Sequence, residues 1–246
     1  MRLLVVVPTH NEADALPVTM RDLQRYLPDS ATVLIVDNGS TDNTAVVARK
    51  LGFAVLCLAE AGKAIAVKEA LHYGLSHGWT HFIVFDADGQ HPSGSVTEVA
   101  AMLEDCENVI VKGTRFSSGP PEGTPIERIE LNSDTRAVLR SFGCSLSDPQ
   151  CGLLGFSSFY ADFFLTCMRW DYYFELEMIF LLWSSGRVSD VVELPISTQY
   201  VGLPGKKQEE KYADSEDAAN KRAQRNREYS DYAKACMARF FSNHAI

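Results

Sequence analysis

The chain has 246 residues, 46% of them hydrophobic, which is enough apolar material for one large α/β domain or one domain with an appendage. Its formal net charge is −9, from 23 basic and 32 acidic residues. No basic surplus is therefore present to neutralise the phosphates of a nucleic acid, and we expect no nucleic-acid partner. A few local arginines and lysines would still suffice to bind a phosphate ligand.

The six cysteines show no Cys-x-x-Cys spacing and fall on apolar segments. This predicts reduced thiols of an intracellular protein, not a disulfide framework or a zinc site. The first residues are too short for a signal-peptide core, and no apolar run approaches the ~20 residues of a membrane helix. We therefore expect a cytoplasmic protein that is soluble or, alternatively, peripheral on the cytoplasmic membrane face.

The first ninety residues alternate between short apolar runs of strand length and longer segments with helical spacing. Ser40 is the expected N-cap of the second helix. Alternation at this spacing predicts a parallel, doubly wound sheet that binds ligands at the carboxyl ends of its strands. The predicted strands are residues 3–7, 33–36, 53–58 and 81–85, and the predicted helices are residues 11–26, 41–51 and 63–76.

Polar residues follow each of the first two predicted strands. The first strand is followed by Pro8-Thr9-His10-Asn11-Glu12, and the second by Asp37-Asn38-Gly39-Ser40. Taken singly, Asn11 and Ser40 would cap helices and Asp37 would make a turn. The strands are parallel, so both groups lie at one edge of the sheet, and together they favour a nucleotide pocket.

The usual Gly-rich nucleotide motifs are missing from the sequence. No Gly-x-Gly-x-x-Gly follows the first strand, which removes the main support for a nicotinamide or flavin site. No Gly-x-x-x-x-Gly-Lys-Ser/Thr occurs either, which excludes a P-loop. The Gly-rich opening loop that nucleotidyltransferases carry on a similar sheet is also missing.

The fourth predicted strand ends in the string Asp86-Ala87-Asp88-Gly89-Gln90-His91-Pro92. Asp-x-Asp-Gly alone is often a turn. After a buried strand, however, the string places three oxygen-bearing side chains, those of Asp86, Asp88 and Gln90, at the strand end. Such side chains suit Mg²⁺ or Mn²⁺, which proteins usually hold through one or two carboxylates plus substrate phosphates. We therefore predict a metal site here with open positions for a diphosphate.

This string resembles the metal motif of the dolichol-phosphate mannose synthase-like enzymes of glycosyltransferase family 2. Residues 8–12 are similar to the opening Pro-x-Tyr/His-Asn-Glu of that family, and residues 36–42 to its Val-Asp-Asp-Gly-Ser-x-Asp, with Asn38 in place of the second aspartate. Gly62-Lys63-Ala64 resembles its Gly-Lys-Gly, with Ala64 in place of a glycine. The resemblance covers residues 3–197. It implies a GT-A type α/β fold: a Rossmann-like, doubly wound, mostly parallel sheet with helices on both faces.

The resemblance also implies how a nucleotide-sugar donor would be held. Asp88 and Gln90 would bind the cation, and Asp86 would contact the ribose, the cation or a metal-bound water. Lys63, at a helix start, would meet a diphosphate oxygen, the alternative being an ordinary surface lysine. The residues expected at the donor are Pro8, Thr9, Asn11, Glu12, Asp37, Asn38, Gly39, Lys63, Asp86 and Ala87.

The second half of the chain is expected to bind the acceptor. The predicted strand 109–112 is followed by Gly113-Thr114-Arg115-Phe116, similar to the family's Gly-Ser-Arg-Tyr/Phe, and Arg128-x-x-x-Asn132 sits where polyprenyl-phosphate transferases carry Arg-x-x-x-Ser/Asn. Two converging arginines match phosphate oxygens bidentately, whereas a lone Arg128 would be solvated surface. Asp148-Pro149-Gln150-Cys151-Gly152 looks like the Asp-x-Thr/Gln-Cys/Ser-Gly-Phe signature of the same group. The implied catalytic residues are Asp88, Asp86, Arg115 and Arg128.

The last predicted elements are a helix over residues 172–186 and a strand over residues 188–196, which resemble the Phe-Glu-x-Glu helix and Glu-Val-Pro-Ile strand of the family. Glu177 either orients the site or braces the helix. Residues 214–241 read as a long surface helix with an apolar patch that would dock on the domain, a partner or a membrane surface. We expect a catalytic domain over residues 1–200 and a helical appendage over residues 201–246. The patch comprises Tyr232, Met237, Phe240 and Phe241.

Three functions are compatible with these features. The first is an inverting, metal-dependent transfer of a hexose from a nucleotide sugar of the GDP-mannose or UDP-glucose type to a polyprenyl or dolichyl phosphate. Such an acceptor is already ionised near neutral pH and needs no base. The second is transfer to a hydroxyl, for which Asp134 is the convenient base. The third, a non-catalytic nucleotide-sugar-binding module, has no need of an intact metal site.

Overall fold

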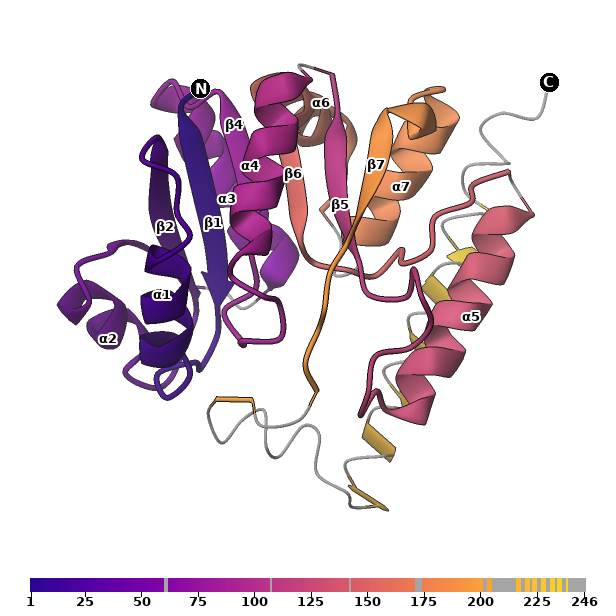
Figure 1. Cartoon of the computed structure of the whole chain (residues 1–246), viewed down its shortest axis with the longest axis horizontal. Coiled ribbons are helices and arrows are strands. Elements are labelled where there is room, and N and C mark those ends of the chain that lie inside the picture. Colours follow the sequence, from indigo (N-terminus) through magenta and orange to yellow (C-terminus); the bar gives the residue numbers. More distant parts are fainter. Residues whose placement is uncertain are drawn as a thin grey trace.

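A seven-stranded sheet with the order β3-β2-β1-β4-β6-β5-β7 forms the centre of the protein (Figure 1). This computed structural model describes residues 1–59, 62–106, 108–141, 143–170, 174–200 and 203–204, together with single and paired helical residues between 216 and 238. The strands are β1 (Leu3–Thr9), β2 (Ala31–Asn38), β3 (Ala54–Leu58), β4 (His81–Val84), β5 (Ile110–Thr114), β6 (Leu154–Ser157) and β7 (Val191–Pro195).

The sheet is mostly parallel, which confirms the expected fold class. β1 pairs in parallel with β2 and with β4, β2 pairs with β3, and β5 pairs with β7. β6 is the exception, because it runs antiparallel to both β4 and β5. The carboxyl ends of the parallel strands therefore meet at one edge, the lower one in Figure 1.

Helices cover both faces of the sheet because its central strands are apolar on both sides. In β1, Leu4 and Val6 pack on one face with α3, α6 and α7. The alternating residues Leu3, Val5 and Val7 pack on the other with α1, α2 and α4. The helices are α1 (Leu16–Gln24), α2 (Thr44–Lys50), α3 (Lys63–Ser76), α4 (Ser95–Asp105), α5 (Ile126–Arg140), α6 (Ser158–Cys167) and α7 (Phe174–Ser184), with a 3₁₀ turn, η1 (Val188–Asp190).

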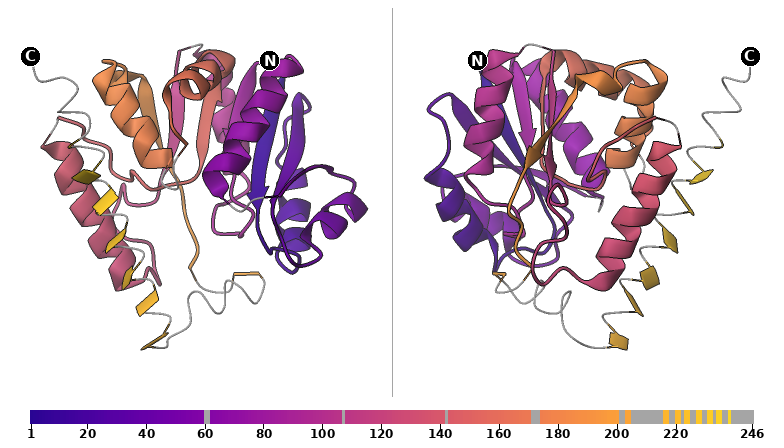
Figure 2. Two further views of the ribbon diagram at one scale, coloured as in Figure 1. Left: turned by 180° about the vertical axis from the view of Figure 1, so that it is seen from behind. Right: turned by 45° about the vertical axis from the view of Figure 1, so that its right-hand side comes forward.

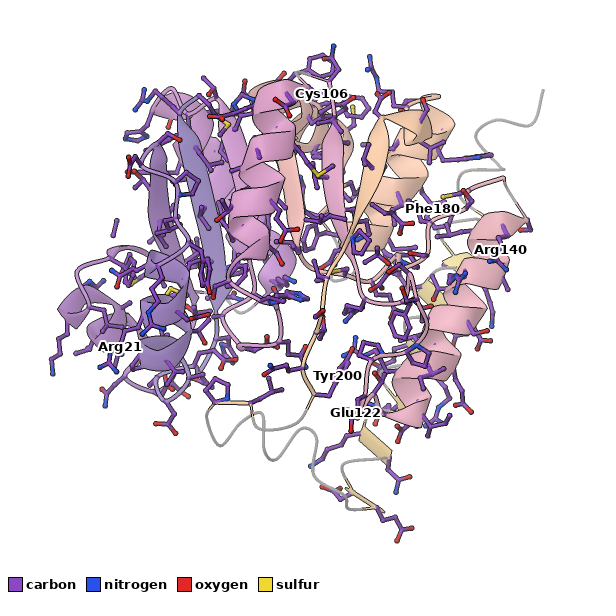
Figure 3. The ribbon with its side chains drawn as sticks, in the orientation of Figure 1. Arg21, Cys106, Glu122, Arg140, Phe180 and Tyr200 are labelled. Carbon is purple, nitrogen blue, oxygen red and sulfur yellow. The ribbon has the colours of Figure 1, made fainter. Side chains whose placement is uncertain are left out.

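Helix α5 stands apart from the sheet, with the helical residues between 216 and 238 beside it (Figures 1 and 2). A third apolar cluster joins α5 to α7, and Figure 3 shows Phe180 of this cluster between the two helices. Tyr232 packs against the same cluster. This residue of the predicted apolar patch therefore docks on the domain, while Met237, Phe240 and Phe241 lie outside the described residues.

Two helix starts differ from the prediction. The first helix begins at Leu16, and its predicted first residue, Asn11, has a φ of 55° that no right-handed helix accommodates. The second begins at Thr44, whose backbone N–H donates to the Asp42 carboxylate at 2.9 Å. The prediction that Ser40 is the N-cap of this helix was therefore wrong.

Within the described residues, no helix is long and apolar enough to cross a membrane. The cysteines of that same part of the chain, Cys57, Cys106, Cys144, Cys151 and Cys167, are all free, as expected.

Candidate active site

The loops that follow β1 and β2 are tied together at the carboxyl edge of the sheet. The strands end in register, with Thr9 opposite Asp37. The side-chain oxygen of Asn11 accepts a hydrogen bond from the backbone N–H of Thr41 at 2.8 Å, and its own N–H donates to Ser40 Oγ at 2.9 Å. Asn11 therefore braces the two loops against each other.

A third loop joins this pair through Asn38. The Asn38 side-chain oxygen accepts a hydrogen bond from Gly62 N at 2.6 Å, just before α3. The Asn38 carbonyl lies 2.9 Å from His10 Nδ1, and this nitrogen must carry the proton because a carbonyl only accepts. Glu12 N donates to Thr44 Oγ1 at 2.8 Å. The predicted nucleotide-binding segments thus form one hydrogen-bonded assembly.

Asp37 lies within this assembly with a carboxylate oxygen that none of the described residues satisfies. The residue is only 8% exposed. Its Oδ1 is buried and has no hydrogen-bond partner among the described residues. Leaving a buried acceptor unpaired costs about 1–3 kcal/mol, so a ligand N–H at this point would be stabilising.

Asp86, the first carboxylate of the predicted metal motif, lies beside a lysine and a histidine of the protein. Lys63 Nζ lies 2.7 Å from Asp86 Oδ1, and His91 Nε2 lies 3.6 Å from Oδ2. Lys63 Nζ also lies 3.1 Å from Glu175 Oε1. Burial alone would raise the pKa of Asp86, but the Lys63 charge and His91 hold it well below its usual range.

Asp88 and Gln90 form the tight turn that follows. Asp88 Oδ1 accepts a hydrogen bond from Gln90 N at 3.1 Å, and Gly89 has a φ of 75°, which glycine adopts without strain. The segment after β7, residues 196–200 and 203–204, covers this turn. Gln199 N donates to Gln90 O at 3.1 Å, and a Cβ on Gly89 would lie 2.8 Å from the Pro204 ring.

The donor set at this turn fits a hard cation. Asp86, Asp88 and Gln90 can each offer an oxygen ligand, and Mg²⁺ is usually held by such a partial set completed by substrate phosphates. No group of three or more His, Cys, Asp or Glu side chains that could hold a metal occurs in the described part of the chain. A protein-enclosed site of the zinc type is therefore not formed by those residues.

On the other side of the edge, Arg115 forms a buried bidentate ion pair with Asp148. Arg115 Nε lies 2.6 Å from Asp148 Oδ2, and Nη2 lies 2.9 Å from Oδ1. The side chains are 3% and 0% exposed. Burial opposes the charged form of Asp148, but the Arg115 guanidinium outweighs it and lowers the pKa of the carboxyl to about 2.

Helix α5 carries Arg128 one turn before a residue that contacts Asp148. Asn132 Nδ2 lies 3.4 Å from Asp148 Oδ1, and Arg128 is one helical turn earlier on the same face. Arg128 is half-buried, whereas Asp134 is exposed, about 200° around the helix from Asn132. Arg128 therefore lies on the face of α5 that points to the Arg115–Asp148 pair, whereas the candidate base Asp134 lies on another face.

Two charged residues beside this site were not singled out from the sequence, Lys112 on β5 and Glu193 on β7. Lys112 is fully buried, and its ammonium donates to the Cys151 carbonyl at 2.7 Å. Burial lowers the pKa of Lys112. Its signal in the sequence was a lysine interrupting an apolar strand. Glu193 accepts a hydrogen bond from Ser147 N at 2.8 Å. The Glu177 carboxylate accepts hydrogen bonds from Arg169 N and Trp170 N at 2.6 and 3.0 Å and so has the bracing role.

Residues 4–162 match the family model described as glycosyl transferase family 2. The chain belongs to this family. It is therefore a glycosyltransferase, and the recognition made from the metal motif is confirmed.

Two similar proteins carry names that refer to polyprenyl or undecaprenyl phosphates. The chain is 24% identical to the polyprenol monophosphomannose synthase of Mycolicibacterium smegmatis over 61% of its own length and 60% of that protein's. It is 26% identical to the undecaprenyl-phosphate mannosyltransferase of Micrococcus luteus over 80% and 83% of the two chains. The alignment thus spans less than two thirds of the mycobacterial protein.

Solved structures of low sequence identity share the fold of this chain. Glucosyl-3-phosphoglycerate synthase from Mycobacterium tuberculosis, in complex with Mn²⁺, uridine diphosphate and glucosyl-3-phosphoglycerate, superposes with a TM-score of 0.61 at 18% identity. The superposition covers 79% of this chain and 69% of that one. At this identity the likeness establishes the GT-A fold alone, as expected from the sequence.

Proposed function

We propose that this family 2 enzyme is an inverting, metal-dependent glycosyltransferase that moves a hexose from a nucleotide sugar to a polyprenyl or dolichyl phosphate. The observation that carries the proposal is a sheet edge with two different halves. One half presents Asp37 and the turn from Asp86 to Gln90, and the other presents Arg115 and Arg128. The first suits a nucleoside diphosphate with its cation, and the second suits a phosphate acceptor.

In the donor half, the unpaired Asp37 oxygen accepts a hydrogen bond from an N–H of the nucleotide base. Pro8 and Thr9 on β1 and Glu12 in the loop after it line the base and ribose, while Gly39 and Ala87 allow the backbone to approach closely. A donor of the GDP-mannose or UDP-glucose type meets these requirements, because guanine and uracil each carry such an N–H.

Asp86, Asp88 and Gln90 would hold Mg²⁺ or Mn²⁺, and the bound cation would supply positive charge to stabilise the departing nucleoside diphosphate. Lys63 leaves Asp86 and contacts the diphosphate, where it adds a positive charge at the N-terminus of α3. The acceptor enters from the face opposite the diphosphate. Attack from that side inverts the anomeric carbon.

In the acceptor half, Arg128 and the N–H groups of Arg115 that Asp148 leaves unused grip the lipid phosphate. A phosphate monoester has a second pKa near ~6, so it needs positioning and no protein base. The exposed position of Asp134 is consistent with this chemistry. The names of the relatives in Mycolicibacterium and Micrococcus give the same acceptor class. A lipid acceptor also requires peripheral contact of residues 1–200, the catalytic domain, or of the appendage 201–246, with a membrane.

The proposal is tested by a donor screen with Mn²⁺ that measures released nucleoside diphosphate. Each nucleotide sugar is incubated with a short polyprenyl phosphate, with the matching dephosphorylated polyprenol, with a panel of sugar and small-metabolite hydroxyl acceptors, or with no acceptor. We expect release with one donor and only with the phosphorylated lipid. Equal release with the polyprenol would remove the phosphate from acceptor recognition.

The hydroxyl acceptors separate the second function from the first. Release with one of them and none with the polyprenyl phosphate would assign the second function. Release that survives EDTA would remove the cation from the mechanism.

A further inference from the structure

Gln150 carries a carboxamide whose two polar atoms are both buried and unsatisfied by the described residues. Neither Nε2 nor Oε1 has a hydrogen-bond partner in the part of the chain that the structure describes. A carboxamide offers two donors and an acceptor oxygen with two lone pairs. Buried polar groups are nearly always hydrogen-bonded, so a side chain with both ends unpaired requires a functional or structural explanation.

The backbone around Gln150 is held firmly on both sides. Before it, Asp148 is fixed by Arg115, and the Asp148 carboxylate accepts a hydrogen bond from Gln150 N at 3.3 Å. After it, the Cys151 carbonyl accepts a hydrogen bond from the buried Lys112 at 2.7 Å. The loop therefore places Gln150 at a defined position between the two halves of the site.

That position is close to the metal motif. A Cβ on Gly152 would lie 2.3 Å from Asp86 Oδ2 and 2.6 Å from Lys63 Nζ, so the Gly152 backbone lies directly against this ion pair. Two residues span at most about 7 Å of chain. The Gln150 backbone is therefore within about 7 Å of the backbone that touches Asp86, which makes Gln150 a neighbour of the metal motif.

The chemistry of the ligand follows from the two unpaired atoms. Phosphate oxygens at neutral pH mainly accept hydrogen bonds, and a cation binds only the oxygen, so either would satisfy one end of the carboxamide. A hydroxyl group both donates and accepts, and a pair of sugar hydroxyls satisfies Nε2 and Oε1 together. We infer that Gln150 binds hydroxyl groups of the transferred hexose and determines which hexose the enzyme accepts. This inference rests on the proposed function.

The side chain reaches the sugar by turning out of its closed position between staggered rotamers. This movement breaks no hydrogen bond of the carboxamide with the described residues, so the new bonds to the sugar are gained at little expense. If this side chain only filled space, an apolar residue of similar size would be expected here, because it would leave no unsatisfied polar atoms.

The test is Gln150→Leu, with the exposed Gln24→Leu on α1 as the matched control. We measure the melting temperature, kcat/KM for the nucleotide sugar, and calorimetric binding of the sugar-free nucleoside diphosphate with Mn²⁺. Gln150→Leu is expected to melt about 2–4 °C higher, since two unsatisfied groups are removed. Its kcat/KM is expected to fall about 10- to 100-fold, with diphosphate binding unchanged. The control should match the wild type in all three.

Deoxyhexose donors then identify the hydroxyl. The loss caused by Gln150→Leu should disappear with the donor that lacks the bound hydroxyl and persist with the others, as in a double-mutant cycle. Higher stability with unchanged kcat/KM, lower stability, or an equal loss with every deoxy donor would overturn the inference. A wild-type enzyme that releases no diphosphate from any nucleotide sugar would overturn the proposed function as well, so the two failures are distinguishable.

Discussion

Lys63 Nζ lies 2.7 Å from Asp86 Oδ1, so the first carboxylate of the metal motif already has a positive charge beside it. The same ammonium lies 3.1 Å from Glu175. Burial alone would lower the pKa of Lys63, but the two carboxylates outweigh it and raise the pKa. Lys63 therefore stays charged throughout the physiological range, and a cation that binds Asp86 must compete with it.

Replacing Lys63 by Met should strengthen Mn²⁺ binding in the absence of nucleotide. The side chains of Lys63 and Asp86 are 31% and 25% exposed, so solvent screens the pair and its contribution is about 1 kcal/mol. This corresponds to about fivefold tighter binding, measured by calorimetry. Turnover should fall at the same time, because the diphosphate loses a positive charge. Lys50→Met on α2 is the exposed control, and weaker Mn²⁺ binding by Lys63→Met would contradict the competition.

Asp88→Ala should remove most turnover because it deletes a charged oxygen ligand. Asp88→Asn keeps an oxygen at the same place without the charge, and it should leave a weak enzyme that needs more Mn²⁺ for half-maximal rate. The measurement is diphosphate release against Mn²⁺ concentration for both variants. Wild-type activity of Asp88→Ala in EDTA would falsify the metal-dependent mechanism.

The parallel half of the sheet and its helices were predictable because each strand and helix is encoded by the residue pattern of its own short segment. The third helix, for example, has the predicted limits, since Gly62 precedes its first residue and apolar residues recur at helical spacing through it. Strand β6 was not predicted. It is only four residues long, and its antiparallel direction follows from its neighbours β4 and β5, which no local pattern encodes.

In the site, the chemically active residue types were predictable and their partners were not. The string from Asp86 to Gln90 predicts oxygen ligands, but nothing in it specifies Lys63 as the partner of Asp86. Likewise, Arg115 reads as a free phosphate ligand until β5 and β6 pair and bring the loop with Asp148 beside it. Partners of this kind depend on tertiary packing, so a sequence-based role for a charged residue is incomplete until its counter-charge is found.

Arg128→Ala is the cleaner test of the acceptor. Arg128 is half-buried on α5, and the structure gives it no ion pair with the described residues, so its removal should leave stability nearly unchanged. Losing a charge-assisted contact to phosphate costs roughly 2–3 kcal/mol, or about 30- to 150-fold in kcat/KM for the lipid phosphate. Calorimetric binding of the donor should barely change.

The exposed Arg140→Ala at the other end of α5 controls for general loss of positive charge. A collapse of donor affinity in Arg128→Ala would instead place Arg128 on the donor diphosphate. It would remove the main structural support for a lipid-phosphate acceptor.

The Arg115–Asp148 pair should make stability depend on acid pH. The folded-state pKa of Asp148 is about 2, below the ordinary value of 3.8, so the unfolded chain binds this proton more readily. The stabilisation is therefore complete above about pH 4 and is lost as the pH falls through about 2; its size is about 2 kcal/mol. Urea unfolding of the wild type at pH 7, 4 and 3 should show the decline begin below pH 4.

Asp148→Asn should abolish this acid-dependent component and lower stability at pH 7 by about 3–5 kcal/mol, because Arg115 is then buried without a counter-charge. The double variant Arg115→Met/Asp148→Leu removes both charges and should recover most of that loss, while its activity stays low if Arg115 also binds the acceptor. If Asp148→Asn is as stable as the wild type at pH 7, the pair contributes little and the buried guanidinium has another partner.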